Sequence, residues 1–453
     1  FVQIDREDSN PYYEPGDDAC KEFMKVIRAY ERGERSSPIF KACLKDEVRP
    51  KAKAVAGKTR VFYSTPLGFY MALRAYLMPF YSLMQEHSDV FCTAIGVNMM
   101  TQAGDLYDRL SDFSENIIEG DYGGFDVSMP YLVGQGAAEV AYNVCEAFGY
   151  TKEQLKVVGG LLSDLLHPNV AFLSDVIEVA GLQPSGKYAT AEDNSIRGVI
   201  LLMYCWYSND ALKEYDFFDY VLPLTYGDDV VAGVKEEIRE HFNMLTYKDF
   251  CESVYGIEFT TASKDEITEE FITPDQMSFL KRTFRFDERF GHVMAPISLE
   301  TILKMLQWYA PSESASKLDQ LVSTANCALL ELLLHLDEEK WSVARERLQA
   351  VLRKDHGDVV TLRTYDETVQ IIVQIEDGWE GICDDDEGTA AESGPLRQPE
   401  DDYSLDRELS SNQWSATNFL MYLQRLYIER EELEAALDKM ENPMPGYTMR
   451  QLR

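Results

Sequence analysis

Apolar and polar residues alternate along this chain with periods that predict helices, short strands and turns. Residues 14–38 predict a turn, an amphipathic helix and a second turn, and residues 65–84 predict a helix that is apolar around most of its surface. Residues 115–148 predict a short apolar strand, a glycine-rich turn and a helix. After a stretch at 149–180 that we interpret as rich in loops, a Pro-Ser-Gly turn leads into another helix within residues 181–207.

The segment "YGDDVV", residues 226–231, lies between two apolar runs that predict strands. Gly227 and Asp228 stand where a tight hairpin needs a residue that tolerates positive φ. Strand alternation breaks down at a turn, so Asp228 and Asp229 can both lean toward one point. Adjacent carboxylates repel each other unless a positive group lies beside them. An ordinary hairpin turn, which is often rich in Gly and Asp, stays open as the alternative for this segment alone.

The last third of the chain changes character twice. Residues 298–309 and 317–354 predict strongly amphipathic helices. From residue 371 the chain becomes acidic and poor in branched apolar residues, as linkers that cannot bury a core are. Residues 418–440 then predict a final helix. The sequence leaves open whether this tail is a linker or a partner-binding segment with an amphipathic helix.

Composition limits the class of protein. At 453 residues and 45% hydrophobic content, the chain can bury large cores in more than one lobe. It holds no apolar run of about eighteen residues, and its start, "FVQIDREDSN", lacks the features of a signal peptide. The eight cysteines are scattered without CxxC spacing, which favours reduced thiols and a cytosolic setting. The net charge of −35 argues against wholesale nucleic-acid binding, so any such contact requires a local basic patch.

One such patch occupies residues 45–60 of this acidic chain. It is either a solvated basic loop or an arm that handles phosphate groups, and both interpretations stay open on this segment alone. Its cationic residues are Lys45, Arg49, Lys51, Lys53, Lys58 and Arg60.

Further candidate residues stand at the ends of predicted elements. Asp121 ends a predicted strand, where it could bind a metal ion. Asp126, five residues on, either caps the next helix or lies beside a bound substrate. Thr190 and Asn194 are four residues apart, so they share one helical face and can line a cleft.

Together these residues are the parts of a two-metal site for phosphoryl transfer. Mg²⁺ is held in proteins through a few carboxylates plus substrate phosphates, which suits Asp121, Asp228 and Asp229. One ion would activate a hydroxyl nucleophile and the other would support a pyrophosphate leaving group. The basic segment would neutralise a triphosphate.

The order of segments resembles the RNA-dependent RNA polymerases of positive-strand RNA viruses, most closely those of the picorna-like order. "KDEVRPKAKAVAGKTR" resembles the nucleotide-entry motif of that family, and "DYGGFD" resembles its first palm motif. "PSGKYATAEDNS" fits the second palm motif, "YGDD" the third, and "FLKR" at 279–282 the motif between palm and thumb. The five motifs stand in the family's order, and the resemblance covers roughly residues 40–350.

The resemblance implies roles for single residues. Asp121 and Asp228 would be the principal ligands of two Mg²⁺ ions, for which Mn²⁺ can substitute, and Asp229 a supporting ligand. Asp126 and Asn194 would recognise the ribose 2′-hydroxyl, which both donates and accepts hydrogen bonds. The nucleotide-binding residues that the resemblance implies are Lys53, Lys58, Arg60, Asp126, Ser185, Gly186, Thr190 and Asn194.

Two lysines complete the implied site. Lys264 lies seventeen residues before Lys281 and is the candidate general acid that protonates the leaving pyrophosphate. The alternative for Lys264 is a surface lysine beside Asp265 and Glu266. Lys281 would contact the backbone of the primer strand.

The implied architecture is an α+β right-hand polymerase with fingers, an antiparallel-sheet palm and a helical thumb. We expect a polyprotein fragment that lacks much of the amino-terminal fingers segment and polymerises poorly by itself. The expected parts are partial fingers at 1–115, a palm at 116–295 with an inserted fingers segment at about 150–185, a thumb at 296–370, and an acidic linker with a terminal helix at 371–453.

The implied function is template-directed RNA synthesis from NTPs at the 3′ end of an RNA primer, in the host cytoplasm at viral replication complexes. Expected partners are template and primer RNA, NTPs, a genome-linked protein primer and other viral replication proteins. A reverse transcriptase is one alternative, which the pair Asp126 and Asn194 disfavours. A catalytically incompetent RNA-binding fragment is another, which the clustered acidic residues disfavour.

Overall fold

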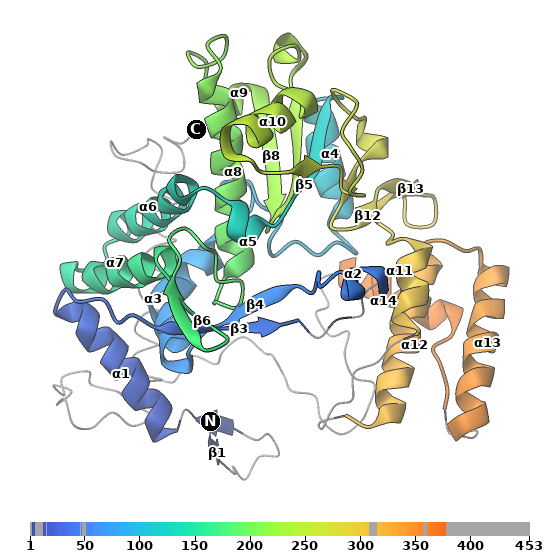
Figure 1. Cartoon of the computed structure of the whole chain (residues 1–453). Helices are drawn as coiled ribbons and strands as arrows, with labels where there is room; N and C mark the ends of the chain where they lie inside the picture. The colour runs from blue at the N-terminus through green and yellow to red at the C-terminus, as the bar shows by residue number, and fades with distance from the viewer. Residues whose placement is uncertain are drawn as a thin grey trace.

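A four-stranded antiparallel sheet lies at the centre of the computed structural model, with strand order β10-β5-β9-β8 (Figure 1). The structure describes residues 2–4, 12–14, 16–45, 47, 51–307, 315–356 and 360–376. The strands of this sheet are β5 (Ile117–Tyr122), β8 (Val221–Tyr226), β9 (Asp229–Val234) and β10 (Phe259–Thr260).

Helices cover both faces of this sheet because its strands are apolar on both sides. Val230, Ala232 and Val234 of β9 pack in a core with α8 (Thr190–Ser208), which lies against β8. Val231 points the other way, into a core with α4 (Ala103–Phe113). Alternate residues of a strand face opposite sides, so the apolar run of β9 serves both cores. The hairpin predicted at "YGDDVV" is confirmed as β8 and β9.

A second four-stranded sheet has the order β4-β3-β6-β7. It combines β3 (Ile39–Leu44) and β4 (Val61–Ser64) with β6 (Asn169–Phe172) and β7 (Asp175–Glu178), and β3 runs parallel to β6. The helices α1 (Asp17–Glu31), α3 (Leu67–Glu86), α6 (Tyr131–Ala147) and α7 (Lys152–Leu166) pack with one another in the same half of the molecule.

The interpretation of residues 149–180 as rich in loops is wrong. This stretch contains α7 and the β6–β7 hairpin. A capping box starts α7, in which the Thr151 side chain accepts from the backbone of Gln154 and the Gln154 side chain accepts from the backbone of Thr151. The helices predicted within residues 14–38 and 65–84 are confirmed as α1 and α3.

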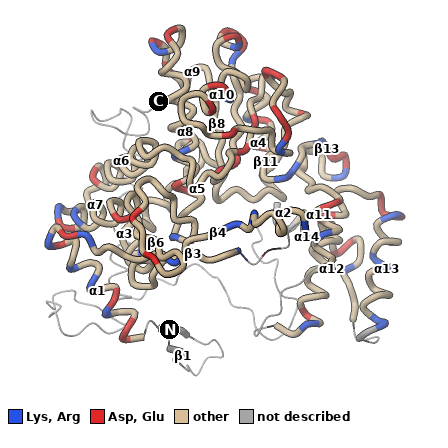
Figure 2. The backbone as a smooth tube through the Cα atoms, in the orientation of Figure 1, with Lys and Arg blue, Asp and Glu red and all other residues tan. Residues whose placement is uncertain are grey.

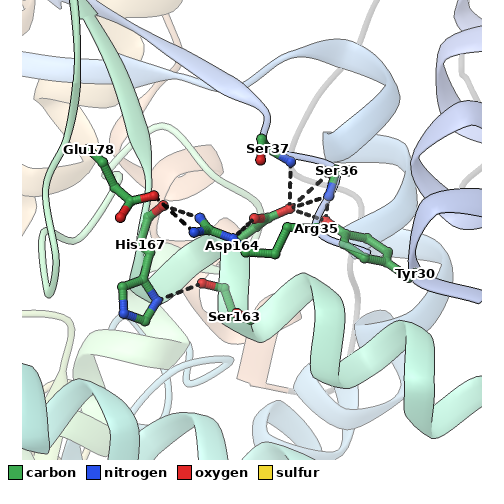
Figure 3. A network of polar contacts seen from close by, with 8 residues as sticks. All are labelled: Tyr30, Arg35, Ser36, Ser37, Ser163, Asp164, His167 and Glu178. Carbon is green, nitrogen blue, oxygen red and sulfur yellow. Dashed lines mark hydrogen bonds and ion pairs between the residues drawn. The ribbon is translucent and has the colours of Figure 1, made fainter. Parts of the chain in front are cut away.

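A buried carboxylate joins the loop after α1 to α7 (Figure 3). Asp164 is 0% exposed and accepts from the Tyr30 hydroxyl at 2.7 Å and from Arg35 Nε at 2.7 Å. It also accepts from the backbone N–H groups of Ser36 and Ser37 at 3.1 and 3.0 Å and from Ser36 Oγ at 3.0 Å. We call Asp164 and these four partners the Asp164 clamp.

Arg35 extends the clamp to the second sheet. Its two terminal nitrogens donate to Glu178 of β7 at 2.9 Å and to the His167 carbonyl at 2.6 Å (Figure 3). The loop that leads into β3 is therefore fixed both to α7 and to the edge of the sheet that β3 enters.

Four helices form a separate bundle, which stands at the right of Figure 1. They are α11 (Leu299–Met305), α12 (Lys317–Leu333), α13 (Glu338–His356) and α14 (Tyr365–Glu376). Trp341 lies fully buried in the core of the bundle and donates to the Leu329 carbonyl at 2.8 Å. The helices predicted at 317–354 are confirmed as α12 and α13.

The boundary expected at residue 371 falls inside α14, whose Ile371 and Ile372 are buried. The other expected boundaries stay predictions. The helix expected at 418–440 lies outside the described residues, as does the acidic linker beyond residue 376. Within the described part of the chain, no helix has the length and apolar character needed to cross a membrane. The antiparallel central sheet and its helices confirm the α+β class.

Candidate active site

Three aspartates meet at one end of the central sheet. Asp121 in β5 is the direct register partner of Asp229 in β9. Residues directly opposite each other in an antiparallel pair project to the same face, so these two carboxylates are neighbours. Asp228 occupies the turn between β8 and β9 beside Gly227, whose φ of +65° favours glycine.

The electrostatics of this cluster show that it lacks positive charge. Burial and the carboxylates of Asp228 and Asp121 together raise the pKa of Asp229 to about 6, even though Lys281 and Lys264 act to lower it. Like charges directly opposite in a sheet destabilise it. The two lysines therefore compensate only part of the repulsion, and a cation placed here would relieve the rest.

Lys264 points at this cluster. Its Nζ lies 2.5 Å from Asp121 Oδ2. The backbone of Lys264 has a φ of +69°, and hydrogen bonds between Thr261 and Asp265 close the turn around it. The turn thus holds a non-glycine residue in the left-handed region and directs its side chain toward Asp121. The ion pair brings Lys264 to the aspartates, and its catalytic role stays a prediction.

Asp126 lies in the first turn of α5 (Phe125–Ser128), close to the cluster. Burial raises its pKa most, the carboxylate of Asp228 also raises it, and the cations of Lys45 and Arg60 lower it. Asp126 is not a helix cap, because Gly124 is the N-terminal cap of α5. The buried Ser185 Oγ beside it has no hydrogen-bond partner among the described residues. Both groups are available to a ligand.

Gly186 brings the loop before α8 against β4. A parallel bridge joins Gly186 to Ser64, and Thr65 Oγ1 donates to the Gly186 carbonyl at 2.9 Å. A Cβ on Gly186 would lie 2.2 Å from the Tyr63 carbonyl oxygen. Backbone packing therefore requires glycine here, whatever contact Gly186 makes with a nucleotide.

The start of α8 connects the other site residues. Thr190 is its first residue and donates to the Lys187 carbonyl at 3.0 Å. Asn194, one turn later, accepts from Gln183 at 2.8 Å. Ser195 Oγ accepts from the backbone N–H of Gly227 at 2.9 Å, which ties α8 to the turn that carries Asp228.

The basic segment lies between β3 and β4 and includes α2 (Lys51–Val55). In Figure 2, blue segments mark this region below the tip of β8. Arg60 pairs with Glu47 at 3.6 Å, and both Arg60 and Lys45 lie near enough to Asp126 to lower its pKa. Lys53 and Lys58 are exposed, and no polar contact joins them to an aspartate within the described residues. Their role stays a prediction.

Lys281 stands in a strained turn beside the aspartates. It follows Leu280 in the two-residue connection between β11 (Ser278–Phe279) and β12 (Arg282–Thr283). Leu280 and Lys281 have φ values of +55° and +61°, which two-residue hairpins of type I′ require. The backbone N–H of Ser278 donates to the buried Glu119 of β5 at 2.7 Å, so this hairpin is anchored beside the strand of Asp121.

Comparison with known proteins identifies the family. Residues 5–338 match the family model described as viral RNA-dependent RNA polymerase. The chain belongs to this family. The replicase polyprotein of Drosophila C virus is 29% identical over 343 residues, which cover 70% of this chain and 19% of that polyprotein. The replicase polyprotein of acute bee paralysis virus is 30% identical over 361 residues, covering 76% and 18%. The chain thus spans about a fifth of the length of these relatives.

A solved structure shows the same fold. The Sicinivirus 3Dpol RNA-dependent RNA polymerase superposes with a TM-score of 0.67 at 20% identity, covering 83% of this chain and 74% of that one. The right-hand polymerase fold expected from the sequence is confirmed. The central sheet is accordingly the palm, and the bundle of α11 to α14 is the thumb.

Viral RNA-dependent RNA polymerases generally use divalent metal ions, and the palm carboxylates fit such ions. Asp121, Asp228 and Asp229 are hard oxygen ligands that repel one another. Among the described residues, no group of three or more His, Cys, Asp or Glu side chains is arranged to hold a metal ion by itself. Mg²⁺ keeps several waters and binds through one or two carboxylates plus substrate phosphates, so the aspartates would hold it together with a nucleotide.

Sequence reasoning missed a set of buried polar residues under this polymerase site. They lie in the loop before α8 and on α8 itself. A signal was present in the sequence, since Asp193 and Arg197 stand four apart in an otherwise apolar helix and so share a face. The buried polar residues are Gln183, Lys187, Asp193 and Arg197.

Proposed function

We propose that this chain catalyses template-directed RNA synthesis in viral replication, adding nucleotides from NTPs to the 3′ end of an RNA primer. The observation that carries the proposal is the register pairing of Asp121 with Asp229, with Asp228 in the adjoining turn. Family membership supports the reaction class.

The three carboxylates would hold two Mg²⁺ ions, for which Mn²⁺ can substitute. When bound, such ions supply the positive charge that lowers the pKa of a primer hydroxyl and stabilises the pyrophosphate leaving group. Asp121 and Asp228 are the principal ligands in this proposal, and Asp229 supports them. Asp121 and Asp229 are both half-buried at their strand positions, whereas Asp228 is exposed at the turn and free to follow a substrate.

The remaining residues bind and orient the substrates. Arg60 offers a fork of donors to triphosphate oxygens, with Lys53 and Lys58 as point charges. Asp126 and Asn194 read the ribose 2′-hydroxyl, with Ser185 and Thr190 closing the site around the sugar. The buried, unpartnered Ser185 Oγ supports this assignment, because a buried hydroxyl without a partner costs free energy until a ligand satisfies it.

Lys264 is the proposed general acid. Its ammonium group is close enough to Asp121 to lie beside the phosphates of a nucleotide held by that carboxylate. It would donate a proton to the leaving pyrophosphate. Lys281, beside Asp229, would contact the primer backbone.

Further partners follow from the same proposal. They are template and primer RNA, a genome-linked protein primer and other replication proteins, with the host cytoplasm as the setting. The relatives that support this are named replicase polyproteins.

The decisive experiment measures incorporation of a labelled complementary NTP on a primed homopolymer, with Mg²⁺, with Mn²⁺ and with EDTA. Asp228→Asn should lower the rate roughly a thousandfold, because loss of a ligand charge costs several kcal/mol of transition-state stabilisation. Asp229→Asn should be milder and should shift the preference toward Mn²⁺.

Asp210→Asn is the matched control, because Asp210 is exposed and its ion pair within the described residues is with Lys213, three residues away. It should leave the rate unchanged. A rate within tenfold of wild type for Asp228→Asn would remove Asp228 from the site. Equal losses for Asp228→Asn and Asp229→Asn would contradict their ranking.

A further inference from the structure

Gln183 connects the two residues that read the sugar. It is 0% exposed and lies in the loop before α8. Its backbone N–H donates to the Asp126 carbonyl at 2.9 Å. Its side-chain Nε2 donates to Asp193 Oδ2 at 2.6 Å and to Asn194 Oδ1 at 2.8 Å. One residue therefore contacts both Asp126 and Asn194.

Asp193 is held as a charged acceptor. Arg197 Nε lies 3.2 Å and Lys187 Nζ 3.6 Å from its Oδ2, the oxygen that Gln183 contacts. Burial opposes ionisation of Asp193, but Lys187 and Arg197 outweigh it, so the pKa of this carboxyl is lowered. An ionised carboxylate only accepts hydrogen bonds.

The charge on Asp193 fixes the orientation of two amides in turn. Gln183 must present its NH₂ group to Asp193, because its carbonyl oxygen would meet a carboxylate oxygen. The second hydrogen of that NH₂ goes to Asn194, which must therefore present its own carbonyl oxygen to Gln183. The Gln183 Oε1 atom is buried without a partner in the described residues, so nothing at its other end sets this orientation.

We propose that Gln183 and Asp193 are positioning residues that fix the Asn194 amide as a hydrogen-bond donor to the ribose 2′-hydroxyl. This inference rests on the proposed function. The 2′-hydroxyl has one hydrogen, which Asp126 accepts, so its oxygen needs a donor on the other side. An Asn194 turned the other way would set a carbonyl oxygen against the hydroxyl oxygen. Sugar selectivity thus depends on a buried network that does not touch the nucleotide.

The first test is Gln183→Glu, which keeps the shape of the side chain. Nε2 supplies two hydrogens, whereas the new carboxyl group supplies at most one, so Asn194 loses its donor and turns to donate toward residue 183. The ratio of ribonucleotide to 2′-deoxyribonucleotide incorporation should fall about tenfold, the effect of one lost hydrogen bond.

Incorporation of a 2′-amino-2′-deoxynucleotide is a second measurement on the Gln183→Glu variant. A neutral 2′-amino group has two hydrogens, so it can donate both to Asp126 and to a turned Asn194 carbonyl. Its incorporation relative to the ribonucleotide should therefore rise in Gln183→Glu. General damage to the site would lower both rates and would not raise this ratio.

Gln183→Met removes the amide altogether and has a matched control in the thumb. Gln349 is also a buried glutamine with two hydrogen bonds, from its Nε2 to the Val360 carbonyl at 2.5 Å and from the Leu362 N–H to its Oε1 at 2.7 Å. Melting temperatures of both Met variants measure the structural cost. Only Gln183→Met should lower the ribose to deoxyribose ratio.

Each outcome decides something. An unchanged ratio in both Gln183 variants overturns the inference, as does an equal fall in Gln349→Met. One of the two Gln183 variants could melt below the assay temperature. The incorporation ratio is then measured with the other Gln183 variant, at a temperature at which that variant is folded. If the wild-type chain incorporates no nucleotide, the proposed function fails instead. The inference is then judged by the binding of ATP against 2′-dATP in titration calorimetry, where an unchanged affinity ratio in Gln183→Glu overturns it.

Discussion

At the scale of single residues, Lys264 pairs with Asp121. To act as the proposed general acid, its ammonium group must also reach the leaving phosphate. The Lys264 side chain is 69% exposed, so solvent screens this pair and it contributes little to stability. The left-handed backbone conformation of Lys264 costs free energy, as is common at functional sites, which agrees with the proposed role.

Lys264→Met should lower the maximum rate of incorporation much more than it raises the nucleotide Michaelis constant, because a general acid acts in the chemical step. General acids contribute roughly a hundredfold or more, so a loss of that order is expected. Steady-state kinetics with a varied NTP checks this. Lys248→Met is the control, since Lys248 pairs at 3.5 Å with Glu266 rather than with a palm aspartate. A change in the Michaelis constant alone would make Lys264 a binding residue.

At the scale of elements, the site depends on a backbone crossing. The loop before α8 carries Ser185 and Gly186, and it meets β4 at Ser64. β4 in turn begins directly after Arg60 of the basic segment. The loop that carries Ser185 and Gly186 and the basic segment that ends at Arg60 are thus placed relative to each other through the contact of Gly186 with β4.

Gly186→Ala should destabilise the chain by about 1–3 kcal/mol and lower its affinity for NTPs, because the added Cβ would clash with the Tyr63 carbonyl. Thermal unfolding and nucleotide titration check both effects. Gly159→Ala is the matched control. A Cβ there would lie 3.6 Å from the Tyr142 ring, an ordinary contact, so the change in α7 should stabilise by about 0.5–1 kcal/mol. A Gly186→Ala chain as stable as wild type would mean that the loop can move away from β4.

Elements with strong periodicity could be predicted from the sequence, and elements without it could not. The hairpin of β8 and β9 and the helices α1, α3, α12 and α13 have one clear apolar pattern each, and all were found. The second sheet was missed because β7 is exposed along its whole length, so it shows no alternation of buried and exposed positions. The start of α7 did carry a signal, the capping box of Thr151 and Gln154.

The same distinction holds for the site. Asp121, Asp228 and Asp229 could be placed together because strand ends and turns are visible in the sequence. The register that makes Asp121 and Asp229 direct partners needed the structure. The sequence does not predict a role for Gln183, because that role depends on hydrogen bonds to Asp193 and Asn194 that only the structure shows.

At the scale of the whole molecule, the Asp164 clamp joins α1 and the loop before β3 to α7. Its carboxylate is fully buried and collects five hydrogen bonds, one of them from the Arg35 guanidinium. Arg35 keeps its ion pair with Glu178 when Asp164 is neutralised, so the cost falls on the buried donors that lose their acceptor.

Asp164→Asn should therefore destabilise the chain by about 1–3 kcal/mol, read as the free energy of unfolding in a denaturant titration. Glu34→Gln in the same loop is the control. Glu34 pairs with Arg32 at 2.8 Å, but both side chains are exposed, so the change should stay within about 0.5 kcal/mol. Equal effects of the two substitutions on the free energy of unfolding would show that Asp164 stabilises the chain no more than an exposed residue does.

The Asp164 clamp also has a consequence in time. Tyr30 and Ser37 lie 134 and 127 residues before the carboxylate that binds them. A ribosome adding about 5–20 residues each second needs roughly 6–27 s to cover that distance. During this interval α1 and α3 have both been made and can pack against each other, but Tyr30 and the loop after α1 still lack the carboxylate that binds them. The final position of the loop that leads into β3 is therefore set only after the chain has been synthesised as far as α7.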